Sequence, residues 1–552
     1  MDDSSQSNER QVLPRWRTLP NTPAHELKSA QRRSLPTPVV DIHRSSESRR
    51  WSGAKTVETA CEMMELSILL GNEATGEEAA IWILRNKERV QPDAVRLARC
   101  ITGEVKPHEA TNYSGSWISN HAGRSRLIGS LKKLLLEHPR DAISYTELSR
   151  LYFLSGQHRQ AQAALEMALR LAPDNRFVLR SAAQLFESLR DPERALAYIW
   201  RSDAVKGDPW VQAAEIALAD RCDKSPRHGT KRLNELLTVE EGQLWTSELA
   251  AGLASLEFKN ASKLRRVRRL LQNSANRPTE NSLAQILWLE EHSGVSVHAQ
   301  SLATQITAAH EAQARVYYDE RNYVGARKES MAWLNDQPFS IDAAREVMFT
   351  SGIHLGDYST AASVGIDALK IHPRDPSLIN AQFHALAMAG DIDGATQMFA
   401  KLEEFRSNRD IVPYIHAGRG LLAFLTKDPI HGRLHYEKAV EAARDYKKPT
   451  LATNALIFWL EQEVICGSIT PEDATFAVSK IDEALMKGKK AERRELAPTW
   501  ETKRSAILGI PKEPTFITLG DAQTKDGKRV RFGLNRDVLP DHLARNLVTF
   551  DA

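Results

Sequence analysis

Small residues recur along this chain at a nearly constant distance. The recurring alanines are Ala161, Ala195, Ala326, Ala361 and Ala395, with spacings of 34, 131, 35 and 34 residues. The long gap divides into four steps of about 33, and within it Trp245 and Ala261 stand 16 apart, as Tyr145 and Ala161 do. A period of this length is typical of repeat architectures, in which one supersecondary unit stacks on the next. We therefore expect one continuous array of helical units.

The clearest unit is the segment 142–175. The positions that carry its pattern are Tyr145, Leu148, Ser149, Tyr152, Gly156, Ala161, Leu165, Ala168 and Pro173. The large apolar residues form one stripe of a first helix, and the small ones let a second helix approach it closely. The glycine and the proline end the two helices. With these residues the segment resembles the tetratricopeptide repeat (TPR), a hairpin of two antiparallel helices called A and B.

The tetrapeptide His-Pro-Arg-Asp occurs twice, at residues 138–141 and 372–375, and the 234 residues between the copies equal seven units of about 33.4. It is close to the His-Arg-Asp of kinase catalytic loops, but a proline intervenes and no Asp-Phe-Gly accompanies it. We interpret the motif as structural: the proline stops one helix, and Asp141 or Asp375 caps the next.

The sequence thus predicts an all-α fold, an α-solenoid of stacked antiparallel helix pairs like a TPR superhelix. The array covers 124–508, with its clearest units at 142–205 and 307–444. Around it we expect a disordered basic arm at 1–55, N-terminal helices at 56–103 and a linker at 104–123. The tail 509–552 should hold a small β-hairpin, because β-branched residues flank Lys525-Asp526-Gly527.

Composition gives weak constraints on location and partners. The formal net charge of +3 exerts no strong global pull toward nucleic acid. The basic excess lies in the arm, which carries ten Lys and Arg against six Asp and Glu through Thr56. The four cysteines are far apart, without a C-x-x-C pair, and neither a secretory signal nor a membrane-spanning apolar run is visible. We expect a cytoplasmic protein that does not bind membranes.

Motifs for catalysis, cofactors or metals are missing from the sequence. Gly53-Ala-Lys-Thr56 lacks the first glycine of a phosphate-binding loop. His431 and His435 are four residues apart on one helix, but no third metal ligand follows them. Asp391 and Asp393 fit a turn between helices better than a calcium site. The expectation is a non-enzymatic protein without cofactor or metal.

The TPR resemblance implies a binding groove lined by helix A residues, which in that family takes a protein or peptide segment. The residues at the family's groove positions are Thr146, Arg150, Phe153, Arg180, Gln184, Glu311, Arg315, Tyr318, Asn380 and His384. Arg150 and Arg180 lie on adjacent A helices at positions we take as equivalent, so together they could bind a carboxylate. The asparagine that precedes such a clamp in chaperone-tail binders is replaced by Glu147 and Ser181, which argues against that particular ligand.

A basic stretch supports a different class of function. Lys263, Arg265, Arg266, Arg268 and Arg269 share one predicted helix with Leu264, Val267 and Leu271 on its other side. Such a helix can bind phosphate or an acidic partner, although pairing of its arginines with neighbouring acids is the interpretation we favour. The leading hypothesis is therefore a protein interaction scaffold. The alternatives are a regulatory or nucleic-acid-associated protein and an accessory subunit of a separate enzyme.

Overall fold

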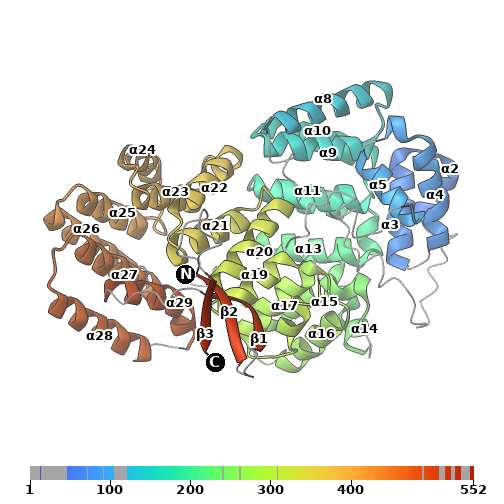
Figure 1. Cartoon of the computed structure of the whole chain (residues 1–552). Coiled ribbons are helices and arrows are strands. Elements are labelled where there is room, and N and C mark those ends of the chain that lie inside the picture. Colours follow the sequence, from blue (N-terminus) through green and yellow to red (C-terminus); the bar gives the residue numbers. More distant parts are fainter. Residues whose placement is uncertain are drawn as a thin grey trace. The chain divides into compact units, whose positions relative to one another are not determined.

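The structure is a computed structural model that describes Leu13 and residues 46–70, 73–90, 92–104, 121–238, 242–259, 263–306, 309–487, 490–508, 516–523, 529–535 and 547–551. Most of the arm, most of the 104–123 linker and the turn expected at 525–527 lie outside these residues. The chain divides into two compact units (Figure 1). The first is Met1–Ser351 with Ser363–Leu378, and the second is Gly352–Ala362 with Ile379–Ala552.

The first unit begins with four helices ahead of the repeats, and the first of them lies at 46–53, inside the range 1–55 that the sequence analysis assigned to a disordered arm. They are α2 (Ser46–Gly53), α3 (Val57–Leu70), α4 (Glu73–Arg85) and α5 (Pro92–Ile101). Trp51, Met64 and Ile83 are buried among them, and the same cluster includes Ile143 and Phe177 from the first two repeats. These helices therefore pack directly on the start of the array.

The rest of the first unit is a series of helix hairpins. α8 (His121–Glu137) leads into them. In A then B order they are α9 (Ala142–Leu154), α10 (His158–Leu171); α11 (Arg176–Ser188), α12 (Pro192–Arg201); α13 (Pro209–Arg221), α14 (Leu233–Thr238); α15 (Leu244–Phe258), α16 (Leu264–Asn276); α17 (Glu280–Ser293), α18 (Ala299–Ala303); α19 (His310–Asp319), α20 (Tyr323–Asp336); and α21 (Ile341–Phe349). α22 (Tyr358–Ile371) crosses the boundary between the units.

The local signals seen in the sequence act as expected. Asp141 caps α9 by accepting hydrogen bonds from the backbone N–H groups of Ile143 and Ser144, both at 3.1 Å. Asp375 accepts from the corresponding groups of Ser377 and Leu378, both at 3.0 Å. A carboxylate at this position satisfies donors that the helix itself leaves unpaired. The structural interpretation of His-Pro-Arg-Asp is thus confirmed.

The recurring alanines lie where helices A and B touch. All five are at most 1% exposed. In the first hairpin, the Ser149 hydroxyl donates to the Ala161 carbonyl at 2.6 Å, a contact that larger side chains at these positions would prevent. The fold is the predicted α-solenoid of stacked antiparallel helix pairs.

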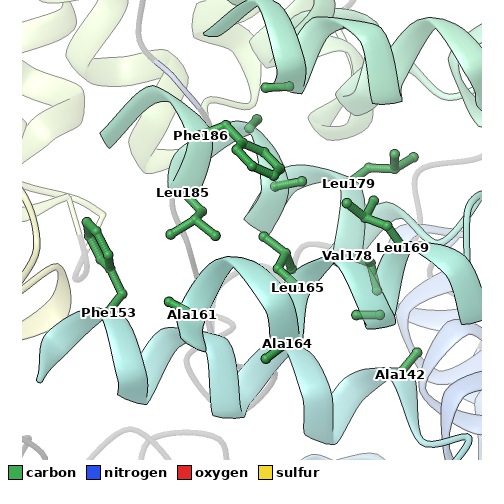
Figure 2. Packing of buried hydrophobic residues seen from close by; sticks show 14 of the residues in the cluster. Ala142, Phe153, Ala161, Ala164, Leu165, Leu169, Val178, Leu179, Leu185 and Phe186 are labelled. Atoms are coloured by element: carbon green, nitrogen blue, oxygen red, sulfur yellow. The ribbon is translucent and has the colours of Figure 1, made fainter. Parts of the chain in front are cut away.

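Figure 2 shows the core of the first two hairpins, where Leu165 of α10 faces Leu185 and Phe186 of α11. The Phe153 ring stands apart from this group. It points toward the pale yellow segment of the chain. Leu13, from the N-terminal arm, is partly buried and packs against the same cluster.

The first unit closes on itself. An imidazole nitrogen of His158 lies 2.7 Å from the Ile371 carbonyl oxygen, and Arg190 donates to Asp375 at 2.8 Å. His372 bonds the Phe339 carbonyl at 2.7 Å, and its ring meets Phe153 edge-on. The second His-Pro-Arg-Asp copy therefore returns to the beginning of the array and buries Phe153 there.

The second unit continues the same hairpins. Its further helices are α23 (Pro376–Met388), which starts at the unit boundary, α24 (Ile392–Glu403), α25 (Val412–Leu425), α26 (Pro429–Asp445), α27 (Pro449–Ile465), α28 (Pro471–Lys487) and α29 (Lys490–Ile507). None of the helices in the described ranges is both long and apolar enough to span a bilayer.

The C-terminal tail holds three strands instead of the two-stranded hairpin expected from the sequence. β1 (Phe516–Gln523), β2 (Arg529–Asn535) and β3 (Leu547–Asp551) form an antiparallel sheet in the order β1-β2-β3. Phe516 pairs with Asn535 and Val530 with Asp551, and the register shifts between Thr518 and Gly520. β3 was not among the strands expected from the sequence.

Candidate partner-binding face

Polar contacts join neighbouring A helices of the first unit from α11 to α19. We call the surface formed by α9, α11, α13, α15, α17, α19 and α21 the helix-A face. At its centre the Arg180 Nη2 atom donates to both carboxylate oxygens of Glu248, at 3.1 and 3.3 Å. The Arg180 guanidinium also lies over the Trp210 ring, 4.7 Å from its centroid, in cation–π geometry. One arginine on α11 thus contacts α13 and α15.

Further polar groups extend this network in both directions. Glu248 accepts from the Thr279 hydroxyl at 3.2 Å and from the Asn281 amide at 3.4 Å, which brings in the start of α17. Arg176 pairs with Asp208 and lies 5.5 Å from the Trp210 centroid. Trp210 therefore contacts two guanidinium groups, each neutralised by its own carboxylate.

Two donors at the centre of the face have no acceptor among the described residues. They are Arg180 Nη1 and the Trp210 indole nitrogen. Arg180 is only 9% exposed, so solvent satisfies this donor poorly. A buried N–H group without an acceptor costs about 1–3 kcal/mol. The described part of the chain thus leaves two buried donors at the centre of the face unsatisfied.

Charge separates the two layers of the hairpins in the first unit. The seven A helices from α9 to α21 carry thirteen acidic and six basic residues, a net charge of −7. The B helices from α10 to α20 carry five acidic and ten basic residues, a net charge of +5. The A layer is thus the more acidic of the two and the B layer the more basic.

Several expected groove residues do not reach a surface. Thr146 and Phe153 are fully buried, and the Thr146 hydroxyl donates to the Ala142 carbonyl at 2.9 Å. Phe153 is enclosed because Phe339 and His372 return to it from the far end of the unit. Their assignment to a partner contact is corrected: both residues support the fold.

The arginine pair expected from the sequence, Arg150 with Arg180, does not form. Arg150 is the ninth residue of α9, whereas Arg180 is the fifth of α11, so the two are one helical turn out of register. Arg150 pairs with Glu147 at 2.9 Å, and Arg180 pairs with Glu248. Each guanidinium already holds a carboxylate of this chain. A shared clamp for an external carboxylate is therefore not present.

Four expected groove residues of the first unit remain, and they differ in exposure. Gln184, Arg315 and Tyr318 are partly exposed, and Glu311 is buried. Arg315 lies 3.8 Å from Glu291 on α17. Burial raises the pKa of Tyr318, and the nearby Glu346 charge adds to the effect, so this phenol stays protonated.

In the second unit the corresponding side of the hairpins is covered by the chain itself. Asn380 is partly exposed, while the His384 ring lies between Tyr358 and Phe458. Lys503 of α29 donates to Glu461 at 2.6 Å in a buried ion pair and reaches the Tyr358 hydroxyl at 3.4 Å. Burial, aided by the Lys503 charge, lowers the pKa of His384 to about 3. His384 therefore packs against its own chain as a neutral ring.

The basic helix, α16, is an outer B helix, as the favoured interpretation predicts. Lys263 and Arg266 pair with Glu257 at 3.1 and 3.5 Å. Arg265 and Arg268 are exposed, and no ion pair within the described ranges involves them; Arg269 is partly buried. Val267 and Leu271 are buried, but Leu264 is 42% exposed. The apolar side of α16 thus begins one turn later than the sequence suggested.

The candidate metal residues serve local structure. His431 bonds Asp428, the cap of α26, while His435 stacks on His416. Asp391 caps α24 through the Gly394 N–H at 2.9 Å. No group of three metal-ligating side chains occurs in the part of the chain that the structure describes.

Sequence reasoning missed Trp210, Glu248, Arg176 and Asp208. Asp208-Pro209-Trp210 is a helix-start signal like Asp191-Pro192, and Asp208 indeed caps α13 through Trp210 N–H at 2.9 Å. Reading that signal places Trp210 at the second position of an A helix, on the groove side. The degenerate spacing in this stretch of the chain hid it.

Known proteins resemble this chain only weakly, and only among solved structures. No protein-family model and no curated protein matches the sequence. Among solved structures the chain is similar to the human IFIT1 dimer with PPP-AAAA, at 14% identity over 70% of this chain and 95% of that chain, with a TM-score of 0.34. It is also similar to yeast Tom70, at 13% identity over 80% of this chain and 97% of that chain, with a TM-score of 0.26. Likeness at this level carries no argument about ligand or mechanism.

Proposed function

We propose that this chain is a non-enzymatic interaction scaffold of the TPR family that binds a segment of a partner protein on the helix-A face of its first unit. The observation that carries the proposal is the network of Arg180, Trp210 and Glu248, which joins three A helices and holds unused donors at its centre. A partner segment supplies the missing acceptors through its main-chain carbonyl groups. Main-chain recognition of this kind holds an extended segment without demanding one particular sequence.

The charge of this face favours a neutral or basic segment. A net −7 on the A helices repels a polyanion, so acidic tails and nucleic acid fit this face poorly. We further propose a cytoplasmic location, which the thiols of Cys222 and Cys466, neither of them in a disulfide, support.

The test is a capture experiment with a conservative variant. Full-length wild type and the double variant Arg180→Lys/Trp210→Phe are used as bait in extracts of the native host. The substitutions keep a positive charge and an aromatic ring but remove the two unused donors. We expect partner retention to fall at least about tenfold, the effect of about 1.4 kcal/mol. Equal retention by the two baits contradicts the proposal.

A second candidate function rests on the outer layer. The net charge of +5 on the B helices and the exposed Arg265 and Arg268 favour an anionic ligand, such as nucleic acid, on that side. Binding of this kind weakens by orders of magnitude between about 50 and 200 mM salt, whereas binding through hydrogen bonds responds little. Arg265→Ala/Arg268→Ala is the matched variant. Loss of capture by this variant alone supports the second candidate.

A further inference from the structure

The N-terminal arm touches the first unit at one defined point. Leu13 is partly buried and packs against the cluster built by α8 to α13, which also includes Phe339 and Ile371. This contact joins a residue of the arm to a cluster that has members from both ends of the closed array. An apolar side chain seated in a core cluster holds the chain next to it at that place.

The residues around Leu13 match the charge of the helix-A face. Arg10, Arg15 and Arg17 flank it in the sequence, and no acidic residue occurs between positions 10 and 17. The A helices carry a net charge of −7. A short segment with three arginines and an apolar anchor thus complements this face in charge.

The chain length permits the contact to extend over the whole face. Leu13 and Ser46, the first residue of α2, are 33 residues apart, enough to span up to about 110 Å when extended. Pro14 lacks a main-chain donor, but like every residue of the segment it has a carbonyl group of the kind that Arg180 and Trp210 need as acceptor.

We propose that the segment around Leu13 binds the helix-A face of the first unit in cis, as an internal ligand that an external partner must displace. The proposal rests on the proposed function, since both use the same face. It also gives the basic arm a role: the arm imitates the partner and sets a threshold for partner binding. Because the competing segment is tethered, its effective concentration is in the millimolar range.

Limited trypsin digestion of the full-length chain tests the docking. Trypsin cuts after Arg10, Arg15 and Arg17, and docking protects these bonds. We expect Leu13→Asp to increase the cleavage rate of the arm about tenfold or more. The matched control is Leu136→Asp, a leucine that is 85% exposed on α8, and it should cleave at the wild-type rate. Equal rates for Leu13→Asp and wild type overturn the proposal.

A labelled peptide of residues 8–20 tests the face directly. It should bind the full-length Leu13→Asp chain at least about fivefold more tightly than wild type, because the tethered segment no longer competes. Equal binding, or none to either chain, contradicts docking on this face. Protection that disappears on dilution assigns the arm to a second copy and overturns docking in cis.

The two proposals fail separately. If the partner needs the unused donors but Leu13→Asp changes nothing, the scaffold function stands and the internal ligand is wrong. If the peptide binds but Arg180→Lys/Trp210→Phe retains all partners, the face serves only the arm, and the proposed function is wrong.

Discussion

The two units use the same helix hairpins but finish the helix-A side differently. In the second unit α29 lies over it, and Lys503, Glu461, Tyr358 and His384 complete one another's contacts. In the first unit the central network leaves Arg180 Nη1 and the Trp210 N–H without acceptors among the described residues. The contrast teaches that a repeat groove becomes a binding site only where the chain does not fill it.

The largest expected effect concerns the buried pair that closes the second unit. Lys503→Ala leaves Glu461 charged and buried, so we expect the free energy of unfolding of this unit to fall by about 3–5 kcal/mol. Urea denaturation, monitored by hydrogen exchange of the α27 amide groups, measures this loss in the free energy of unfolding. Lys480→Ala, in the exposed pair with Glu483, should cost below about 0.5 kcal/mol. A small loss of unfolding free energy for Lys503→Ala would mean that α29 does not cover the helix-A side of the second unit.

The next effect concerns closure of the first unit. Gly156 and Gly356 both have φ of +71°, but a Cβ on Gly156 meets the Lys370 carbonyl oxygen at 2.7 Å, while one on Gly356 meets nothing within 4 Å. Gly356→Ala should cost about 1 kcal/mol from the left-handed backbone alone. Gly156→Ala should cost about 2–3 kcal/mol because the returning segment must also move. Equal melting temperatures of the two variants would show that the array is open in solution.

Acidification should weaken the second unit through His384. Its pKa is about 3 in the folded chain, below the ordinary value of 6.5, so only the unfolded chain takes up this proton between the two values. Stability is therefore intact above pH 6.5 and falls as pH decreases, by at most about 1.4 kcal/mol per pH unit. Over pH 6.5 to 5 we expect a loss of about 1–2 kcal/mol. His384→Phe, which keeps the ring contacts, should remove this slope in urea titrations.

The smallest effect has the opposite pH dependence and belongs to the first unit. Burial, together with the Glu62 charge, raises the pKa of Glu58 on α3 to about 8. The unfolded chain loses this proton near pH 4.5 and the folded chain keeps it, so stability falls as pH rises between those values. Because Glu58 is partly exposed and solvent screens much of this effect, Glu58→Gln should stabilise the unit by only about 1 kcal/mol at pH 7 and by nothing at pH 4. The control is Glu77→Gln, because Glu77 is exposed. The same gain in stability from both variants would contradict burial of Glu58 as the cause.

The sequence predicted what depends on neighbours within one hairpin. Asp141, Asp375 and the recurring alanines act through residues only a few positions away or in the paired helix, so the period identifies them. Phe153 could not be placed this way. Its burial depends on Phe339 and His372, which come 186 and 219 residues later in the chain. The rotation between successive hairpins that brings them back is not visible in the sequence of any single repeat.

The candidate site was predicted only in part for a related reason. Arg180 was found from its helix position, but its partner Glu248 comes from two A helices further along, in the stretch where the period is weakest. His384 was assigned to a groove because α29, which covers it, follows the recognisable repeats. Local patterns show which side of a helix faces a groove, and distant chain decides whether that groove stays open.

Closure also changes how the first unit should respond to force. An open solenoid extends like a spring, losing one hairpin after another because each touches only its neighbours. Here the bond from His158 to the Ile371 carbonyl spans 213 residues, and Arg190 with Asp375 reinforces it. Pulling on the ends of this unit loads that junction first, so the hairpins between give way together after it breaks. Closure of the first unit should therefore make its hairpins unfold together instead of one after another.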